Sequence, residues 1–498
     1  MVKNQCAIKM KNVNFTYANR TEEGLRDINL TIRRGECVLL TGASGCGKTS
    51  LTRIVNGLIP HFYEGELGGD ISIDGQSITS WKIDELSMKV GSVFQNPRSQ
   101  FFNLDTTNEI AFGCENLGIS REQIVQRVNN TVTDLQISQL MDRNIFSLSG
   151  GEKQMLAIAS AYTLGPDIFV LDEPSANLDA FATNQLRSVM EKLKEEGKTI
   201  LIAEHRLYYL ADIADRILYM DKGRIVQEWS AKEFSKVSKE QRIEMGLRAW
   251  DLSQVQIEPN LNLSIEEQGT SVQHLSVAYT KKAPVLEDIS CVMPRNRITA
   301  IIGRNGHGKS TFARCLCGLT KESSGKVFYC GNEQPYKHRC GQNYFVMQDP
   351  NYQLFSDSVI GEVELSLKRG KREKAVNVLE ILSFLSLNEF AEQHPMSLSG
   401  GQKQRLAIAA GIAQSADVLI LDEPTSGLDY NNMLRVHTLL DQLKAEGKEI
   451  IVITHDYEFL VNTCDCVIVI EDGAIADCYT INTENEEKLL HFFVNIKN

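Results

Sequence analysis

Each half of the chain opens on a stretch where apolar and polar residues alternate. The apolar positions are Val13, Phe15 and Tyr17 in the first half and Leu275, Val277 and Tyr279 in the second. Because successive side chains of a strand point to opposite faces of a sheet, this alternation predicts a strand with one buried face. A second strand is expected at residues 36–40 and 298–302, and a helix is expected to begin near Lys48 and near Lys309.

Short, continuous apolar runs occur later in each half. Residues 167–171 and 417–421 form such runs, and we expect them to be buried parallel strands beside strands at residues 199–203 and 449–454. Strands that alternate with loops and helices predict an α/β core with a mostly parallel sheet. A helix is also expected after Ser120, which would form a capping box with Gln123, since apolar residues follow at helical spacing: Ile124, Val128, Val132 and Leu135.

The two halves join through a short polar connector. Ser230 and Glu233 are expected to cap a helix that ends near Trp250, and a polar stretch with Pro259 follows. We therefore predict a first domain at residues 1–230, a connector at 231–268 and a second domain at 269–498.

Three motifs occur twice, in the same order and about 250 residues apart. The glycine-rich sequence GASGCGKT at residues 42–49 returns as GRNGHGKS at 303–310. The sequence LSGGE at 148–152 returns as LSGGQ at 398–402, and VLDEP at 170–174 returns as ILDEP at 420–424. One such match could arise by chance, but an ordered set repeated twice indicates a tandem duplication of a nucleotide-hydrolysing unit.

The glycine-rich loops predict phosphate binding. Their backbone N–H groups must converge on phosphate oxygens, which a Cβ would obstruct, and the helix N-terminus behind each loop adds partial positive charge. The lysines are expected to reach the β- and γ-phosphates, and the hydroxyls that follow them are expected to bind Mg²⁺. The predicted nucleotide-binding residues here are Gly42, Ala43, Ser44, Gly45, Cys46, Gly47, Lys48, Thr49 and Ser50, with Gly303, Arg304, Asn305, Gly306, His307, Gly308, Lys309, Ser310 and Thr311.

Adjacent carboxylates end the two apolar runs. Asp172 and Asp422 are expected to help hold Mg²⁺, whereas Glu173 and Glu423 can each accept a proton from the attacking water as a general base. The structural alternative is an acidic pair on a solvated loop. That alternative does not explain why four apolar residues precede the pair both times.

Glutamine and histidine complete each predicted catalytic set. Gln95 and Gln348 can bridge Mg²⁺ and the attacking water at the start of a flexible segment. His205 and His455 follow β-branched strands and can donate a hydrogen bond to the γ-phosphate. A single histidine there would more often be an ordinary loop residue. Their equal spacing from the two glutamates favours a catalytic role.

Two further predicted contacts lie outside the glycine-rich loops. Tyr17 and Tyr279 can stack on the adenine ring, although a strand-edge tyrosine that covers the core is the alternative. The Leu-Ser-Gly-Gly segments lie too far along the chain to belong to their own phosphate loops, and they suit a γ-phosphate presented from elsewhere. This suggests two cassettes that face head to tail, with Ser149, Gly150, Gly151, Ser399, Gly400 and Gly401 completing the opposite sites.

This set of motifs resembles the ATP-binding cassettes of ABC proteins over the whole chain except the connector. The resemblance implies two tandem P-loop ABC ATPase domains, each with a mostly parallel sheet core, a helical subdomain and an N-terminal antiparallel β region. It implies ATP and Mg²⁺ as cofactors, with the magnesium ligands Thr49, Gln95, Asp172, Ser310, Gln348 and Asp422. Asp179 and Asp429 match the D-loop, and both sites retain their glutamate, histidine and signature serine.

A finer resemblance is to the ATPase subunits of energy-coupling factor (ECF) importers. This resemblance rests on the segments QNPRSQ at 95–100 and QDPNYQ at 348–353. Glu109 and Glu362 follow them, each 14 residues after the first glutamine. It implies an integral membrane subunit of the T type, a small substrate-binding membrane protein and import of a micronutrient: a vitamin, a vitamin precursor or a transition-metal ion. The docking grooves are expected to be lined by Arg98, Gln100, Glu109, Asn351, Gln353 and Glu362.

The alternative function is a soluble double-cassette ATPase that acts on ribosomes or nucleic acid. Such proteins usually carry a long basic linker or an N-terminal cysteine cluster, whereas this connector is mixed in charge and only Cys6 lies near the N-terminus. A third possible function is DNA repair. For that function this chain would need a coiled-coil or zinc-binding insertion between Lys48 and Ser149, and the segment between these residues is too short to contain one.

Composition and charge agree with a cytosolic ATPase that attaches peripherally to the membrane through a partner. The net charge of −12 makes a general nucleic-acid surface a poor expectation. No secretory signal and no apolar run of membrane-spanning length is recognised. The 12 cysteines are scattered, as expected for reduced thiols. Cys46, inside the first phosphate loop, is either a nucleotide-protected reactive thiol or a buried inert one.

Overall fold

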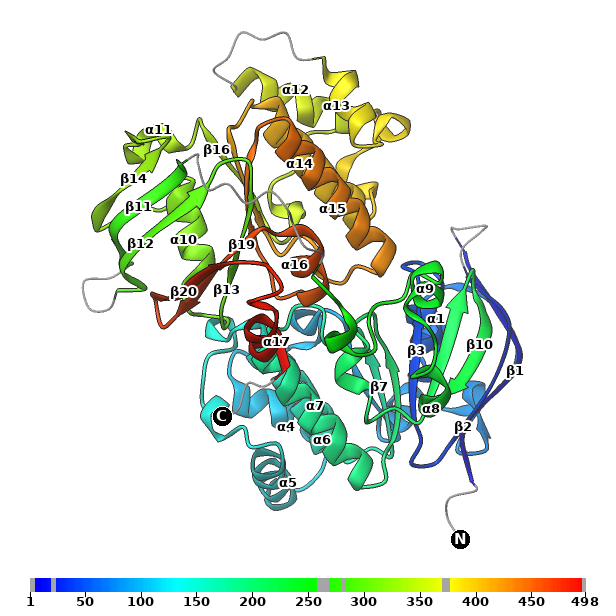
Figure 1. Cartoon of the computed structure of the whole chain (residues 1–498). Helices are drawn as coiled ribbons and strands as arrows, with labels where there is room; N and C mark the ends of the chain where they lie inside the picture. Colours follow the sequence, from blue (N-terminus) through cyan, green and yellow to red (C-terminus); the bar gives the residue numbers. More distant parts are fainter. Residues whose placement is uncertain (1–4, 19–23, 258–267, 280–283, 370–376, 495–498) are drawn as a thin grey trace. The chain divides into compact units, whose positions relative to one another are not determined.

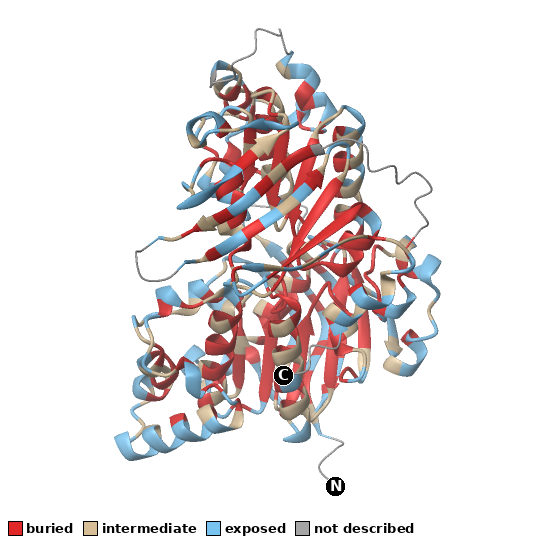
Figure 2. Ribbon diagram, turned by 60° about the vertical axis from the view of Figure 1, so that its left-hand side comes forward, coloured by how far each residue is buried: buried red, intermediate tan, exposed pale blue. Residues whose placement is uncertain are grey.

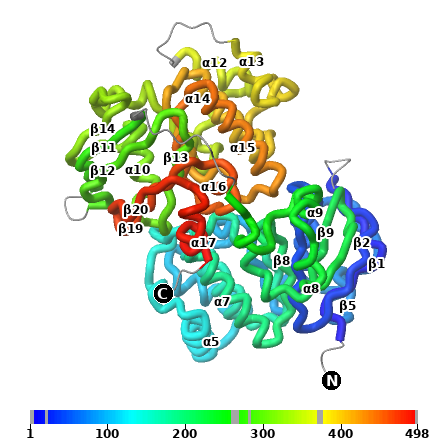
Figure 3. Tube along the Cα trace, viewed as in Figure 1, coloured from blue at the N-terminus to red at the C-terminus, as the bar shows by residue number. Residues whose placement is uncertain are grey.

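The computed structural model describes residues 5–18, 24–257, 268–279, 284–369 and 377–494 (Figure 1). The chain divides into two compact units. One comprises Met1–Gln254 with Asp429–Asn431, and the other comprises Val255–Leu428 with Asn432–Asn498. The colour sequence of the chain trace runs from blue to green through the first unit and from green to red through the second (Figure 3).

The first unit begins with an antiparallel sheet in the order β2-β1-β4-β5. Val13 and Phe15 of β1 are buried while their neighbours are exposed, so the alternation in the sequence marks a half-buried strand, as predicted. The strands of this sheet are β1 (Cys6–Tyr17), β2 (Gly24–Arg33), β4 (Gly65–Ile73) and β5 (Gln76–Ser77).

A six-stranded sheet in the order β10-β9-β3-β8-β7-β6 forms the centre of the first unit. All its pairs are parallel except the edge pair of β9 and β10. Every residue of β3, β7 and β8 is buried, and buried residues are coloured red in Figure 2. The strands are β3 (Cys37–Gly42), β6 (Val90–Val93), β7 (Ile168–Asp172), β8 (Thr199–Ala203), β9 (Arg216–Asp221) and β10 (Arg224–Ser230).

The two faces of this parallel sheet contribute to different cores. Val38 and Leu40 of β3 pack with α1 and the antiparallel sheet, whereas Cys37 and Leu39 pack with α6, α7 and the helical region of α4 and α5. Alternate residues of one buried strand therefore serve both cores. The helices are α1 (Lys48–Val55), α2 (Leu58–His61), α3 (Ile83–Ser87), α4 (Thr106–Asn116), α5 (Arg121–Asp134), α6 (Gly150–Thr163), α7 (Ala180–Glu195), α8 (Ala231–Phe234) and α9 (Lys239–Glu244).

The second unit repeats this plan. Its antiparallel sheet has the order β12-β11-β14-β15, and its six-stranded sheet has the order β16-β17-β18-β13-β19-β20, with only β20 antiparallel to its neighbour. The strands are β11 (Gln268–Val277), β12 (Leu286–Pro294), β13 (Ile298–Ile302), β14 (Ser324–Tyr329), β15 (Asn332–Glu333), β16 (Asn343–Val346), β17 (Val418–Asp422), β18 (Glu449–Ile453), β19 (Cys466–Glu471) and β20 (Ala474–Thr480).

The second unit has helices at most of the same places along the chain. They are α10 (Lys309–Leu316), α11 (Tyr336–Arg339), α12 (Val359–Arg369), α13 (Val378–Phe384), α14 (Gly400–Ala413), α15 (Tyr430–Ala445), α16 (Tyr457–Thr463) and α17 (Glu486–Val494). Between α10 and β14, where every residue is described, this unit has no counterpart of α2, and it has an added helix, α16, after β18. The predicted α/β class, with mostly parallel sheets and a separate antiparallel region in each half, is confirmed. Within the described ranges, no helix has the length and apolar character needed to cross a bilayer.

Two local predictions were wrong. Ser120 precedes α5 but its side chain makes no capping hydrogen bond, so the expected capping box is absent there. Ser230 and Glu233 do form a capping box, but the helix they begin, α8, ends at Phe234 instead of near Trp250. A second capped helix, α9, follows after a break.

The first half of the expected connector packs on the first unit. Phe234 is buried between two tryptophans, with its ring centroid 5.2 Å from that of Trp229 and 4.9 Å from that of Trp250. Residues 258–267 of the expected connector lie outside the described residues. The domain boundaries themselves stay a prediction.

Candidate functional site

Both glycine-rich loops have backbone conformations that side chains would disturb. Gly42 and Gly303, where each loop leaves its strand, have φ of 147° and 146°. A Cβ at Gly42 would lie 2.1 Å from the carbonyl oxygen of Met220, and one at Gly303 would lie 2.0 Å from that of Ile470. Each loop therefore starts in close contact with the neighbouring strand, β9 or β19, which fixes its position at the carboxyl end of an interior strand of the parallel sheet.

Behind each loop a helix presents its N-terminus. Gly47 and Gly308 precede α1 and α10 in the left-handed region, with φ of 109° and 101°, and neither helix is capped by a side chain. The first N–H groups of an α-helix have no partner within the helix, and together with the helix dipole they favour an anion. The two loops are thus suited to hold phosphate groups, as the sequence predicts.

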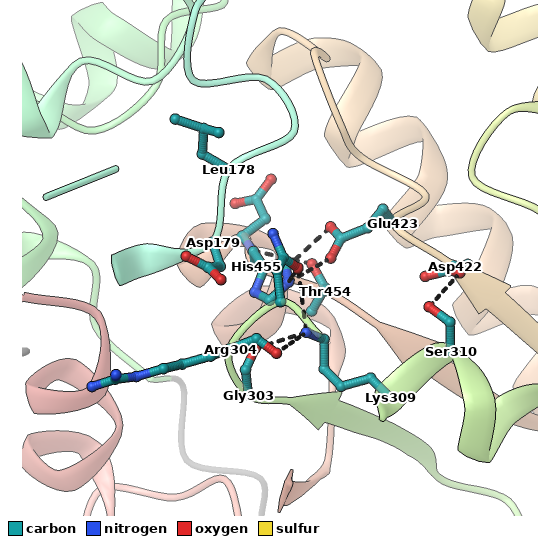
Figure 4. Close-up of polar contacts among 12 residues, drawn as sticks. Leu178, Asp179, Gly303, Arg304, Lys309, Ser310, Asp422, Glu423, Thr454 and His455 are labelled. Carbon is teal, nitrogen blue, oxygen red and sulfur yellow. Dashed lines mark hydrogen bonds and ion pairs between the residues drawn. The ribbon is translucent and has the colours of Figure 1, made fainter. Parts of the chain in front are cut away.

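The loop lysines are buried and fold back over their own loops. Lys48 donates to the carbonyl oxygens of Gly42 at 2.9 Å and Ala43 at 3.2 Å. Lys309 does the same with Gly303 at 2.8 Å and Arg304 at 2.9 Å (Figure 4). These ammonium groups lie at the loop itself, where they can exchange a carbonyl partner for a phosphate oxygen.

The hydroxyl of each loop meets the aspartate that ends the central apolar strand. Thr49 Oγ1 donates to Asp172 Oδ1 at 3.2 Å, and Ser310 Oγ donates to Asp422 Oδ2 at 3.0 Å (Figure 4). Burial, followed by the charge of the adjacent Glu173, raises the pKa of Asp172 to about 6, and burial also raises the pKa of Asp422. A carboxylate whose ionised form is disfavoured in this way gains from a cation. Each hydroxyl–carboxylate pair therefore fits Mg²⁺, for which oxygen ligands are preferred.

The glutamate after each aspartate is held by the backbone as well as by its side chain. Glu173 and Glu423 have φ of 45° and 50°, a region that side-chain-bearing residues seldom adopt. The amide of Glu173 donates to Ala203 of β8 at 2.8 Å, and that of Glu423 donates to Ile453 of β18 at 2.9 Å. The left-handed turn separates the direction of each glutamate from that of the aspartate before it. Strained conformations of this kind concentrate at functional sites.

Histidine and glutamine contact the first glutamate. Glu173 Oε1 lies 3.2 Å from His205 Nε2, and its Oε2 accepts from Gln95 Nε2 at 2.6 Å. Burial raises the pKa of Glu173, but the hydrogen bond and charge of His205 and the charge of Lys48 outweigh it and leave that pKa below its ordinary value. Burial and then the charge of Lys48 lower the pKa of His205. Glu173 is therefore ionised at neutral pH and able to accept a proton.

The second unit repeats the contact between glutamate and histidine. His455 Nε2 lies 3.2 Å from Glu423 Oε1, and the amide of His455 donates to Oε2 of the same glutamate at 3.3 Å (Figure 4). His455 Nε2 also lies 3.1 Å from Asn305 Oδ1 of the phosphate loop. Gln348 follows β16 at the position equivalent to Gln95. The predicted catalytic side chains thus gather at the same end of the parallel sheet in each unit.

In the first unit a single cavity joins the phosphate loop to Tyr17. Its volume is about 580 Å³, within the range of ligand pockets, and Lys48, Thr49 and Glu173 line one part of it while Tyr17 lines another. The Tyr17 hydroxyl lies 3.0 Å from Ser50 Oγ. In the second unit Tyr279 lies just beyond β11, is 58% exposed, and its hydroxyl lies 3.3 Å from Thr311 Oγ1.

The Leu-Ser-Gly-Gly segments begin helices, as expected. Ser149 caps α6 in a capping box with Glu152, and Ser399 caps α14 in one with Gln402. Gly150 and Gly400 are the first helical residues and both are exposed. Besides the phosphate contact expected from the sequence, each serine therefore caps its helix, and the cap fixes the direction in which the segment presents its N–H groups.

The expectation that Glu109 and Glu362 line docking grooves was wrong. Both are buried, and each accepts hydrogen bonds from two successive amides of the loop before it. The side chains of Gln100 and Gln353 also turn inward. Each accepts a hydrogen bond from one main-chain amide and donates to one main-chain carbonyl at the end of β6 or β16. These four residues shape the segment after each site glutamine. The loops that the glutamates support carry two exposed aromatic residues that the sequence analysis missed: Phe102, 74% exposed, and Phe355, 73% exposed.

Cys46 is a buried thiol. It is 4% exposed, and burial, only partly offset by the charge of Lys48, raises its pKa. Because the thiolate is the reactive form, we expect Cys46 to be labelled slowly by maleimide with or without MgATP. Mass spectrometry of labelled peptides provides the measurement, and the exposed Cys330 serves as the fast-reacting control. Rapid labelling of Cys46 that MgATP suppresses would support the reactive alternative instead.

Comparisons with known proteins agree with these features. A family model described as ABC transporter matches the chain twice, at residues 25–176 and 286–426. A putative ABC transporter ATP-binding protein of Treponema denticola is 47% identical, covering 94% of this chain and 96% of its own. The putative HMP/thiamine import ATP-binding protein YkoD of Bacillus subtilis is 31% identical, covering 94% of this chain and 90% of its own.

The fold of the chain is also similar to that of a solved structure. A model of ribosome-bound archaeal Pelota and ABCE1 contains a chain that aligns with a TM-score of 0.68 and 22% identity, covering 96% of this chain and 80% of that one. At this identity the similarity extends to the fold alone.

Proposed function

This chain belongs to the ABC transporter family and is an ATPase that uses ATP and Mg²⁺, and from that premise we propose that it energises an ECF-type importer. It would act at the cytoplasmic face of the membrane as a peripheral subunit. Its partners would be an integral T-type subunit and a small membrane protein that binds the micronutrient. The observation that carries the proposal is the exposed aromatic residue that follows each site glutamine.

Within each site different residues would bind the phosphates, bind Mg²⁺ and accept the proton of the attacking water. Backbone N–H groups of the loops and the ammonium groups of Lys48 and Lys309 hold the phosphates. The hydroxyl–aspartate pairs would hold Mg²⁺, which when bound neutralises charge on the phosphate oxygens. Glu173 and Glu423 would accept the proton of the attacking water. The neighbouring histidines place Nε2 3.2 Å from these glutamates, and their Nε2–H group would exchange the glutamate for the γ-phosphate when ATP binds.

The signature segments would complete the opposite sites. The exposed glycines that begin α6 and α14 leave N–H groups at a helix N-terminus, which suits a phosphate. Ser149 would then serve the site of Lys309, and Ser399 that of Lys48. Closure of the two cassettes on ATP and their separation after hydrolysis would supply the movement that the membrane subunit needs.

The exposed aromatic residues supply a link from the site to a membrane partner. Gln95 contacts Glu173, and Phe102 lies a few residues farther on, where Glu109 fixes its amide at 3.0 Å. In the first unit the exposed side chains of Leu104 and Phe146 lie on segments joined by a main-chain hydrogen bond of 2.9 Å. Apolar groups gathered on a surface indicate an interaction site. A movement of Gln95 would therefore be transmitted to the membrane subunit that binds Phe102.

The curated relatives support transport over action on ribosomes. The chain has nearly the whole length of YkoD, whose name describes import of HMP or thiamine. Its likeness to the ABCE1 chain concerns the fold. We place the cargo of this chain in the same broad class of vitamins, their precursors or transition-metal ions.

The proposal is tested by removing both aromatic side chains. The chain carrying Phe102→Ala with Phe355→Ala is co-expressed with the proposed T-type and substrate-binding membrane subunits, and the complex is purified from detergent-solubilised membranes. We expect co-purification to fall at least tenfold, because each side chain loses a buried aromatic contact worth about 2 kcal/mol or more at an interface centre. Transport by the complex in vesicles should fall with it.

The control removes exposed apolar side chains elsewhere. Val226 of β10 and Val292 of β12 are 59% and 46% exposed, one in each unit, and their double replacement by alanine should leave co-purification unchanged. A wild-type chain that sediments with ribosomes and ignores the membrane proteins would instead establish the alternative function. Full co-purification of the Phe102/Phe355 variant would reject the docking assignment.

A further inference from the structure

The first nucleotide cavity contains an aromatic cluster that the family motifs do not account for. Phe62 and Tyr63, between α2 and β4, line the cavity together with Tyr17 and the phosphate loop. The ring centroids of Tyr17 and Tyr63 are 6.2 Å apart and their planes are nearly perpendicular, at 88°. Two rings set at this angle form a corner, so a flat ligand that lies against one ring presents its edge to the other.

Arg53 of α1 holds this corner together. Its guanidinium carbon lies 4.1 Å from the centroid of the Tyr63 ring, and its Nη1 donates to the Tyr17 hydroxyl at 3.2 Å. One cation thus orients both rings, through a cation–π contact with one and a hydrogen bond with the other. The cluster therefore forms one wall of the cavity.

The second unit has the cation but lacks the added aromatic residues. Arg314 stands in α10 at the position of Arg53 in α1. The segment that carries Phe62 and Tyr63 runs between Gly57 and Gly69, which have φ of 77° and 92°. Its equivalent runs between Gly318 and Gly325, with φ of 70° and 90°, is shorter, and reads LTKESS, without an aromatic residue.

We propose that Tyr63 forms, with Tyr17, a two-walled pocket for the adenine base in the first site only, so that the first site binds ATP more tightly than the second. This inference rests on the nucleotide sites proposed above and adds a difference between them. The base lies flat on Tyr17 and meets Tyr63 along its edge. In the second site Tyr279, which is 58% exposed, stands at the place of Tyr17, and the described residues 318–325 bring no second tyrosine to it.

The size of the effect follows from aromatic contacts. An edge-to-face pair contributes a modest free energy beyond the area it buries, which corresponds to about three- to tenfold in a dissociation constant. Arg53 contributes mainly by preorganisation, because it fixes the Tyr17 and Tyr63 rings before the base binds and so reduces the conformational entropy lost on binding. The unequal sites would make the first cassette the one that retains nucleotide between cycles of cassette closure.

The experiment isolates each site in the full chain. Lys309→Ala removes phosphate binding from the second site and Lys48→Ala removes it from the first, so calorimetric titration with the non-hydrolysable analogue adenylyl imidodiphosphate and Mg²⁺ measures one site at a time. We expect the Lys309→Ala chain to bind about three- to tenfold more tightly than the Lys48→Ala chain. Adding Tyr63→Ala to the Lys309→Ala chain should remove this advantage, whereas Tyr63→Phe should retain it.

A baseless probe separates base recognition from structural damage. Inorganic tripolyphosphate with Mg²⁺ occupies the phosphate loop but has no base, so its affinity should not change with Tyr63→Ala. Equal losses for both probes, or no loss for the nucleotide, would overturn the inference. The Lys48→Ala chain is the matched control, since Tyr63→Ala should leave its affinity unaltered. If Lys48→Ala itself does not remove one binding site, the proposed position of the first nucleotide site is wrong. That result is distinct from a failure of the role assigned to Tyr63.

Discussion

Glu173→Gln and Glu423→Gln are each expected to lower steady-state ATP turnover sharply, by about 10²–10⁴-fold in the site concerned, which is the usual effect of removing a positioned general base. Each glutamine keeps the size and hydrogen-bonding reach of the glutamate but cannot accept the proton of the attacking water. The ionised state of Glu173 is maintained by His205 and Lys48, which keep its pKa below the ordinary value despite burial. The change therefore removes a proton acceptor that is ready at neutral pH.

Phosphate release by the purified single variants is the measurement, with nucleotide binding measured in parallel. Because binding depends on the loops and lysines, both variants should still bind ATP. Glu191→Gln is the matched control, since Glu191 of α7 contacts Arg187 one helical turn away and is half-exposed. Full turnover in both single variants and in the double variant would show that neither glutamate acts as the base. If only one variant loses activity, the two sites hydrolyse unequally.

Gly42→Ala is expected to destabilise the first unit by about 2–5 kcal/mol, from the strain of a side chain at positive φ together with overpacking. At Gly42 the added Cβ would lie 2.1 Å from the carbonyl oxygen of Met220 and 2.9 Å from Cys46 Sγ. Strand β9 cannot move away, because it is hydrogen-bonded to β3 on one side and β10 on the other. Nucleotide binding at the first site should be lost together with the loop conformation.

Thermal unfolding followed by circular dichroism tests this, with an expected drop of about 5 °C or more in the transition of the first unit. Gly45→Ala is the matched control in the same loop. Gly45 also has a positive φ, of 78°, but a Cβ there would meet no atom within 4 Å. It should therefore show only the strain of the backbone conformation, about 1–2 kcal/mol. Equal unfolding temperatures for Gly42→Ala and Gly45→Ala would contradict the role assigned to the contact with Met220.

Much of the fold could be read from local patterns. The strands of residues 199–203 and 298–302 begin and end where the apolar runs do, and α1 and α10 begin at the loop lysines. These features depend on neighbouring residues, because a buried parallel strand needs an unbroken apolar run and a phosphate loop needs glycines. Helix breaks were harder to predict. The cap at Ser230 is correct, but whether the helix continues past Phe234 depends on the two tryptophans against which that side chain packs.

The sequence by itself determined the family, the duplication and the chemical identity of the residues around each phosphate loop, because those properties reside in residue type and spacing. Only the tertiary structure decided which side chains turn inward. Glu109 and Glu362 look like surface residues in the sequence but are buried acceptors for loop amides, and that leaves Phe102 and Phe355 exposed. It also brought Tyr63 into the cavity of Tyr17, through Arg53. The reason is physical: burial and contact between residues far apart in the chain arise from packing of the whole unit, which no local pattern encodes.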